Sequence, residues 1–132
     1  MKIKKNFTLI EAVIATTIMV VVLAGSGYGI SLYLHLINSI HQQDVALYAA
    51  QEKLEEITDN IENVLAYDGQ FFNVTDNSGK NLLVSSSGNP PGHVSVVQNN
   101  DVPSLYGVNV TISWQYSGRP QSLSVNAAFM NK

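Results

Sequence analysis

The hydrophobic and polar positions divide the chain into three stretches with different periods. From Ala12 to Ile40 the chain is almost entirely apolar and contains no Asp, Glu, Lys or Arg. After that stretch the apolar residues recur at helical spacing, and beyond Gly69 they alternate with polar residues in short runs. Helices bury a stripe with a 3.6-residue period, whereas half-buried strands bury every second residue. This order predicts one long helix followed by a small β-sheet.

The apolar stretch is long enough to cross a bilayer. From Ala12 to Leu34 more than twenty residues carry no charge, and a spanning helix needs about 20. Lys2, Lys4 and Lys5 precede it, so the positive-inside rule predicts a cytoplasmic N-terminus. A secretory signal peptide is the alternative, with Ala24-Gly25-Ser26-Gly27 as a loose cleavage site. A discarded signal peptide has no use for the acid Glu11 at the head of its apolar run, which favours the membrane anchor.

The helix is expected to continue beyond the membrane as an amphipathic segment. Apolar residues recur every seven positions, with further apolar residues at the intervening core positions: Ile40, Leu47, Leu54 and Ile61, and then Ala50, Ile57 and Val64. No proline occurs before Pro90, so the helix can extend from about Thr8 to about Leu65 and end at Tyr67-Asp68-Gly69. The opposite side is acidic, through Glu52, Glu55, Glu56, Asp59 and Glu62. That side is interpreted as a solvated surface, with docking against a basic partner as its second possible use.

The last part of the chain predicts antiparallel strands. Runs at 70–75 and 81–85 flank the turn Asp76-Asn77-Ser78-Gly79, and 94–97 is a further short strand. The clearest alternation covers 108–116 and 123–129 on either side of a turn at 117–120, which indicates a hairpin with one buried face. The helical stripe can cover that face. The expected fold class is therefore α+β, a long N-terminal helix packed on a small antiparallel sheet.

Glu11 is the residue whose position most needs an explanation. A charge at the head of an apolar segment is costly unless it has a partner, so it is interpreted as functional. A carboxylate of this kind can pair with an amine of another chain, because misplacement would leave a buried charge unpaired. The alternative is that Glu11 extends to the lipid headgroups, since it lies only a few residues from the basic tip.

The segment Lys4-Lys5-Asn6-Phe7-Thr8-Leu9-Ile10-Glu11 resembles the class III signal of type IV pilins and type II secretion pseudopilins. The resemblance implies cleavage between Asn6 and Phe7 by a prepilin peptidase, followed by methylation of the new N-terminus. It also implies that Glu11, the fifth mature residue, pairs with the N-terminal amine of a neighbouring subunit. The family almost always has glycine before the cut, where this chain has Asn6, which leaves open whether the cut occurs.

The same resemblance extends to the architecture, because pilins also combine a long helix with a sheet-containing head. It implies a leader at 1–6, a transmembrane and assembly half at 7–34, an amphipathic half at 35–66 and a sheet at 67–132 that packs with 35–66 as one domain. The blocks at 49–57 and 108–114 are similar to minor subunits of the pseudopilin I or PilV-like groups. The family also often loosens its helix near Gly25, Gly27 and Gly29, where three glycines weaken helix propensity here by about 1 kcal/mol each relative to alanine.

The resemblance further implies a location and a set of partners. The chain is expected in the inner membrane as a single-pass protein, with its head in the periplasm or outside the cell. The implied partners are other pilin or pseudopilin subunits, the prepilin peptidase, an inner-membrane assembly platform and the lipid bilayer. The function expected is that of a minor structural subunit that joins or initiates a filament, and the sequence leaves open whether the machine serves secretion, motility or competence.

Charge bears on the alternative function, a membrane-anchored adhesion or DNA-uptake subunit. The chain has 7 basic and 10 acidic residues, three of the basic ones in the leader, so the mature side-chain charge is 4 − 10 = −6. Nucleic acid is an unexpected partner, because phosphate binding needs clustered Lys and Arg. The absence of cysteine excludes the C-terminal disulfide loop of many major pilins.

Catalytic or metal-binding patterns are not found. His35 and His41 point to different sides of a helix, and His93 beside a Pro-Gly pair is expected in solvent. The serines at 85–87 lack a nucleophile-elbow setting, and the loop at 76–79 is too short for a calcium loop of the EF-hand type. We therefore expect no enzyme activity, no cofactor and no metal.

Overall fold

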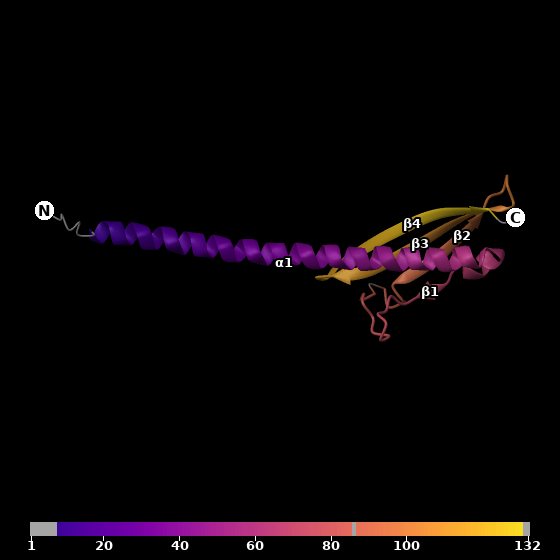
Figure 1. Cartoon of the computed structure of the whole chain (residues 1–132), viewed down its shortest axis with the longest axis horizontal. Coiled ribbons are helices and arrows are strands. Elements are labelled where there is room, and N and C mark those ends of the chain that lie inside the picture. The colour runs from indigo at the N-terminus through magenta and orange to yellow at the C-terminus, as the bar shows by residue number, and fades with distance from the viewer. Residues whose placement is uncertain (1–7, 86, 131–132) are drawn as a thin grey trace. The chain divides into compact units, whose positions relative to one another are not determined.

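The computed structural model describes residues 8–85 and 87–130. These residues form the helix α1 (Leu9–Asp59), the 3-10 helix η1 (Ile61–Tyr67) and the strands β1 (Phe71–Phe72), β2 (Gly92–Gln98), β3 (Leu105–Tyr116) and β4 (Arg119–Met130) (Figure 1). The predicted α+β class is confirmed, and this combination of a long N-terminal helix with a four-stranded antiparallel sheet matches the expected pilin-like fold. The chain divides after Asn38 into two compact units, and the second, from Ser39 onward, contains the whole sheet.

Helix α1 ends earlier than predicted, and a 3-10 helix takes its place. Asn60 leaves helical geometry, with φ −117° and ψ 38°, and its side-chain amide donates to the carbonyl of Glu56. Asn63 inside η1 is also non-helical, with φ −114°. An asparagine side chain can form hydrogen bonds with the nearby backbone, and these compete with the hydrogen bonds of a helix. This explains why the α-helix ends at Asp59 and not at about Leu65. The chain leaves η1 at Tyr67, and Gly69 adopts a φ of +72°. Helical structure therefore ends at the predicted position 67–69, but as a 3-10 helix and not as the continuation of α1.

The sheet is a simple meander in the order β1-β2-β3-β4, with every neighbouring pair antiparallel. Its longest pair, β3 and β4, is closed by Ser117 and Gly118, which have φ angles of 48° and 76°. Positive φ at both positions defines a tight two-residue turn that matches the twist of the flanking strands. Tyr116 therefore pairs with Arg119. The hairpin predicted from the alternation is confirmed, with a shorter turn than the expected 117–120.

The core lies between the sheet and residues 39–59 of α1. From the helices it takes Ala46, Ala50, Ile57 and Val64, and from the sheet mainly Val94, Val108, Val110, Ile112 and Trp114. The predicted core positions Ala50, Ile57 and Val64 are thus confirmed. Ile40 and Leu47 were predicted in the same stripe, but they are 55% and 38% exposed. The small side chains of Ala46 and Ala50 face the sheet instead, and Leu47 is turned away because each residue advances about 100° around a helix.

The segment between β1 and β2 contains less strand than predicted. Only Phe71 and Phe72 form a ladder with β2, and the run at 81–85 contributes isolated bridges, Thr75 with Asn81 and Ser85 with Trp114. In the turn before this run, two backbone amides bond to a side chain and not to another strand. One carboxylate oxygen of Asp76 accepts hydrogen bonds from the amides of Ser78 and Lys80, both at 2.9 Å. Amides held by a side chain cannot extend a ladder.

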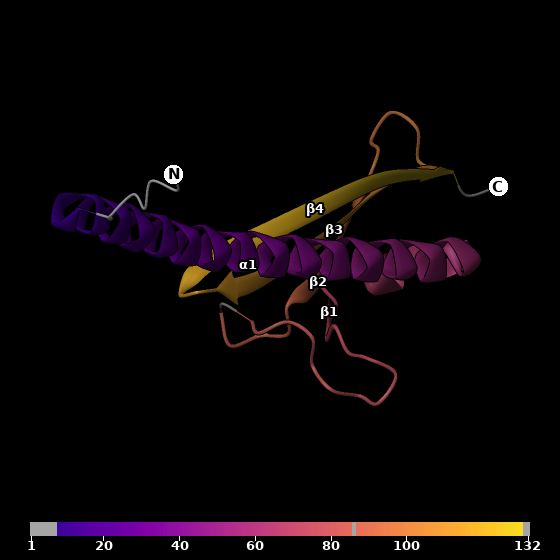
Figure 2. The same cartoon turned by 60° about the vertical axis from the view of Figure 1, so that its left-hand side comes forward.

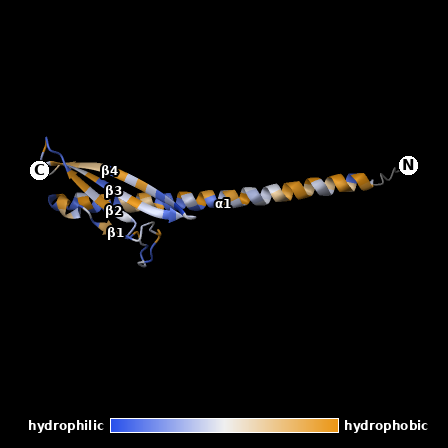
Figure 3. Cartoon of the chain, turned by 180° about the vertical axis from the view of Figure 1, so that it is seen from behind, coloured by the Kyte–Doolittle hydropathy of each residue, from blue (hydrophilic) through white to orange (hydrophobic). Residues whose placement is uncertain are grey.

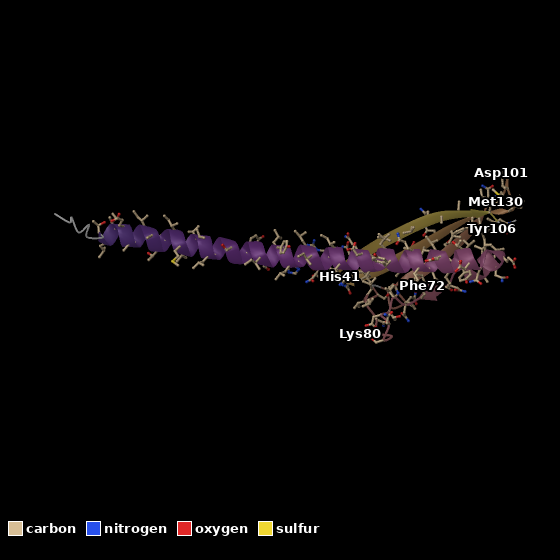
Figure 4. All side chains as sticks on the ribbon, in the orientation of Figure 1. His41, Phe72, Lys80, Asp101, Tyr106 and Met130 are labelled. Carbon is tan, nitrogen blue, oxygen red and sulfur yellow. The ribbon has the colours of Figure 1, made fainter. Side chains whose placement is uncertain are left out.

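The same contacts affect the acidity of Asp76. Hydrogen bonds from the Ser78 hydroxyl and the Lys80 amide hold the pKa of its carboxyl below the ordinary value. Lys80 itself lies at the tip of this loop, on the side away from α1 (Figure 4). The turn predicted at 76–79 is therefore present, and it is fixed mainly by the Asp76 side chain.

Candidate assembly site

The first described residues form a helix cap around Glu11. Helix α1 begins at Leu9, and Thr8 before it accepts the amides of Glu11 and Ala12 on its carbonyl, at 3.0 and 3.2 Å. The Thr8 hydroxyl lies 3.4 Å from the Glu11 amide, and the Glu11 carboxylate lies 3.5 Å from the Thr8 amide. This reciprocal arrangement is a capping box, in which two side chains satisfy backbone donors that the first helical turn leaves free. A carboxylate at this end also interacts favourably with the helix dipole.

The capping box was missed by the sequence reasoning, although a signal for it was present. The pattern Thr-x-x-Glu directly before an apolar run is the recognised signature of this cap. Glu11 therefore has a partner inside its own chain, in addition to the partner predicted in a neighbouring subunit. An ion pair joins Lys53 and Glu56, in the other unit.

The helix that follows Glu11 is apolar on every side and uncovered. The stretch of α1 that is apolar enough to cross a membrane contains no buried residue. In Figure 3 the N-terminal part of α1 is coloured mainly as hydrophobic. A helix that is hydrophobic all round needs an apolar environment. This helix is long and apolar enough to cross a membrane, as predicted.

Three hydroxyl groups within this apolar segment are hydrogen-bonded to the helix backbone. Thr16 donates to the Val13 carbonyl at 2.9 Å, Thr17 to the same carbonyl at 2.8 Å, and Ser26 to the Val22 carbonyl at 2.7 Å. Polar groups in a hydrocarbon environment have to be satisfied internally, because no water is available. These three side chains therefore add little to the cost of placing the segment in lipid.

The three glycines predicted to loosen the helix lie within continuous α-helix. A Cβ atom at Gly25, Gly27 or Gly29 would have no atom within 4 Å, apart from its immediate helical surroundings. No contact within the described chain requires glycine at these positions, so their predicted role in loosening stays a prediction.

The remaining residues singled out from the sequence lie away from Glu11 or outside the described part of the chain. Asn6 and Phe7, the predicted cleavage site, lie outside the described residues. His93, expected in solvent, is instead half-buried in β2, with its ring centroid 4.7 Å from that of Phe71. The acidic side chains predicted along the helix are exposed, as expected.

The head contains an open hollow next to β1. Its volume is about 230 Å³, and it lies between α1 and the start of the 73–75 segment, lined by Glu52, Lys53, Glu56, Phe72, Asn73 and Thr75 among others. The Lys53 ammonium already occupies this region: it binds Glu56 at 2.7 Å and lies 5.2 Å from the ring centre of Tyr67 and 5.5 Å from that of Phe72. Such contacts stabilise the junction of α1, η1 and β1. Lys53, one of the side chains that line the hollow, therefore also holds the head together.

Comparison with known proteins adds no assignment. A scan against protein-family models gives no match, and searches of the curated proteins and of the solved structures give none either. The class that the fold defines is a long apolar N-terminal helix with a small antiparallel sheet packed on its second half, an arrangement compatible with a pilin-like fold.

Proposed function

We propose that this chain is a minor pilin or pseudopilin, a structural subunit that inserts in the inner membrane and joins or initiates a filament. The observation that carries the proposal is the position of Glu11, in the first turn of an uncovered apolar helix and directly after a basic segment that ends in Asn-Phe. A plain membrane anchor has no need of an acid at that position, which costs free energy in lipid.

The capping box adds a physical role for Glu11 before assembly. In the single subunit, the backbone amide and the hydroxyl of Thr8 donate hydrogen bonds to its carboxylate. In the assembled filament, the N-terminal amine of an incoming subunit supplies an opposite charge. Because desolvation offsets much of the attraction between two buried charges, this pairing sets the position of the subunit more than it strengthens binding.

The head is consistent with a structural role. Among the described residues, no group of three or more His, Cys, Asp or Glu side chains is arranged to hold a metal ion. The Lys53 side chain, which lines the hollow beside β1, is held there by Glu56 and by the rings of Tyr67 and Phe72. A structural subunit requires a stable head and surfaces for other subunits, and the core between α1 and the sheet provides the first of these.

The decisive experiment is the intact mass and N-terminal sequence of the chain purified from membranes that contain a prepilin peptidase. The expected product lacks residues 1–6 and begins at N-methylated Phe7. The Asn6→Gly variant is the matched control, because it restores the residue that the family has before the cut. A product that begins at Met1 in both variants would contradict the proposal. Capture of an external ligand without contact to pilin-like subunits would favour the adhesion or uptake alternative.

A further inference from the structure

Two short segments of the head have the pattern Asn-x-Ser/Thr with a residue other than proline in the middle. They are Asn73-Val74-Thr75 and Asn109-Val110-Thr111. This pattern is the acceptor motif of N-linked glycosylation, in which the asparagine side chain receives the sugar. A third match, at 6–8, precedes the apolar helix and is not part of the head. Because three residues also match by chance, the surroundings of each motif decide whether it can be used.

The structure occupies both functional groups of the motif at Asn109. Asn109 is half-buried within β3, and its side-chain amide donates to the side-chain oxygen of Asn126. Its own side-chain oxygen accepts a hydrogen bond from the Thr111 hydroxyl at 2.7 Å, and that hydroxyl lies 2.9 Å from the Ser124 hydroxyl. A sugar on the Asn109 nitrogen would separate this row of cross-strand pairs. The second motif is therefore closed in the folded head.

The motif at Asn73 is open. Asn73 and Thr75 are exposed, and within the described part of the chain neither side chain makes a hydrogen bond. Val74 between them is only 4% exposed, and its carbonyl accepts the Leu82 amide at 2.8 Å. Val74 thus anchors the segment in the core while its two neighbours stay on the surface. In Figure 2 the chain that follows β1 extends as a loop away from α1.

Asn73 and Thr75 also line the same hollow beside β1, which has a volume of about 230 Å³. Glu52 of α1 and the ring of Phe72 line it as well. A sugar joined to the Asn73 nitrogen would have its hydroxyls near an exposed carboxylate, which accepts hydrogen bonds, and its apolar face near an aromatic ring. Lys53 keeps its bond to Glu56 in this arrangement. The acceptor side chain therefore opens onto a space that a sugar can enter.

We propose that Asn73 is an acceptor of N-linked glycosylation, and that the donor is an oligosaccharide carried on a lipid diphosphate. The chain has a helix long and apolar enough to cross a membrane, which would place it in the same bilayer as a lipid-borne donor. The proposal rests on the export of the head in the proposed function, because N-linked motifs are used in surface loops of secreted proteins.

The transfer exchanges one bond for another without oxidation or reduction. The Asn73 side-chain nitrogen forms a bond to the anomeric carbon of the first sugar, and the bond from that carbon to the diphosphate oxygen breaks. The lipid diphosphate leaves, and the amide nitrogen gives up one proton to a base of the transferring enzyme. An enzyme is needed because the lone pair of an amide nitrogen is delocalised into its carbonyl.

The first test measures the acceptor without depending on membrane orientation. The folded full-length chain in detergent micelles is incubated with an oligosaccharyltransferase that accepts Asn-x-Ser/Thr motifs and with a lipid-linked oligosaccharide. Peptide mass spectrometry then reads positions 73 and 109 separately. We expect the oligosaccharide at Asn73 and none at Asn109. Synthetic peptides that copy 70–78 and 106–114 are the control, and both should be modified because neither is folded.

Variants of the same chain test the two residues of the motif. Asn73→Gln and Thr75→Ala should each abolish the addition, whereas Thr75→Ser should retain it because the hydroxyl is kept. Both positions are exposed, so Trp114 fluorescence should be unchanged in all three variants. Asn109→Gln is the matched control in the other motif, and it should leave the addition at Asn73 unchanged.

The second test is the mass of the full-length chain isolated from the membranes of the cells that make it. We expect an oligosaccharide at Asn73 there, and none on the head of Asn73→Gln. Four results would overturn the proposal: addition at Asn109 in place of Asn73 in the folded chain, an addition to the head that persists in Asn73→Gln, no addition in detergent, or an unmodified head in the cells.

The same spectrum also reports whether residues 1–6 have been removed, so the two proposals can fail separately. A chain that begins at Phe7 but is unmodified at Asn73 contradicts the glycosylation proposal alone. A chain that carries the oligosaccharide at Asn73 but begins at Met1 supports glycosylation and contradicts the proposed function.

Discussion

At the scale of single residues, Glu11 has a capping role in addition to the pairing role expected from the sequence. Its carboxylate caps α1 together with Thr8, and it is also the charge proposed to meet a neighbouring subunit. The two roles depend on different properties. Capping needs a hydrogen-bond acceptor, which glutamine also supplies, whereas pairing with an amine needs the negative charge.

Substitutions at Glu11 and Thr8 should therefore separate capping from pairing. We expect Glu11→Gln and Glu11→Ala to insert in the membrane normally and both to lose incorporation into filaments. Either substitution leaves the N-terminal amine of the neighbouring subunit without an opposite charge, and an unpaired buried charge costs several kcal/mol. Thr8→Ala, which removes the cap at about 1 kcal/mol, should keep most of the incorporation. Quantitative immunoblotting of sheared filaments against total membrane protein measures this. Normal incorporation of Glu11→Gln, with a loss only in Glu11→Ala, would show that Glu11 acts as a cap alone.

A second residue-scale constraint lies where β1 meets β2. A Cβ added to Gly92 would collide with the ring of Phe72. Gly92→Ala is therefore expected to destabilise the head by about 1–3 kcal/mol through overpacking, measured by urea denaturation with Trp114 fluorescence.

The control for Gly92 is Gly107, in β3. An added Cβ there would have only the Val97 carbonyl nearby, at 3.7 Å, which is ordinary contact. Gly107→Ala should thus change the free energy of unfolding by less than about 0.5 kcal/mol. Equal effects of the two substitutions would mean that the close approach of Phe72 to Gly92 does not limit the packing.

At the scale of elements, the sequence predicts best where one periodicity is long and uninterrupted. The alternation through Val108, Val110 and Ile112 predicted the strand and its buried face correctly. The heptad spacing also identified the amphipathic part of α1, but it placed Ile40 and Leu47 in the core. Two neighbouring stripes of a helix are both apolar in this sequence, and the structure buries the one with small residues.

Elements set by side-chain hydrogen bonds were harder to predict. The run at 81–85 was predicted as a strand, yet Asp76 holds the backbone of the preceding turn. The capping box at Thr8 was also missed, because Glu11 was considered only as a charge and not as a hydrogen-bond partner of its own backbone. Hydropathy records neither interaction, since both depend on the direction of individual donors.

The glycines in α1 provide a test at this scale. Replacing Gly25, Gly27 and Gly29 together by alanine removes no contact within the described chain and favours the helix by about 1 kcal/mol at each position. If filament entry requires loosening here, the triple variant should insert normally and incorporate several-fold less, measured again in sheared filaments.

Ser31→Ala is the control, because it changes a small residue of the same segment without changing a glycine. Unchanged incorporation of the triple alanine variant would exclude loosening as the role of these glycines. A loss in Ser31→Ala as well would indicate a packing effect instead.

At the scale of the whole molecule, the two units have separate requirements. Every buried hydrophobic residue of the described chain lies between Ala46 and Trp114, and the unit up to Asn38 contributes none. The first unit depends on its surroundings, whereas the second contains its own core.

A chain that begins at Ser39 should accordingly fold alone. We expect residues 39–132 to be soluble without detergent and to unfold cooperatively, with Trp114 shielded from quenchers in the native state. Circular dichroism and urea denaturation measure this, and Ile57→Ala, which opens a cavity at a fully buried position, should lower the free energy of unfolding by about 2–5 kcal/mol. Aggregation of residues 39–132, or a non-cooperative transition, would show that the head depends on the apolar segment.

The single lysine of the amphipathic helix also affects how heads approach each other. Lys53 is directed into the junction with η1 and β1, where its side chain is only 13% exposed. It is the one positive side chain between Asn6 and Lys80. Lys53 pairs with Glu56, so the other exposed acids of the same helical stretch, Glu52, Glu55 and Asp59, have no positive side chain of this helix left to compensate them. Two copies that turn these surfaces toward each other repel over about 8 Å at physiological ionic strength, so the acidic side favours a basic neighbour of a different kind over another copy of itself.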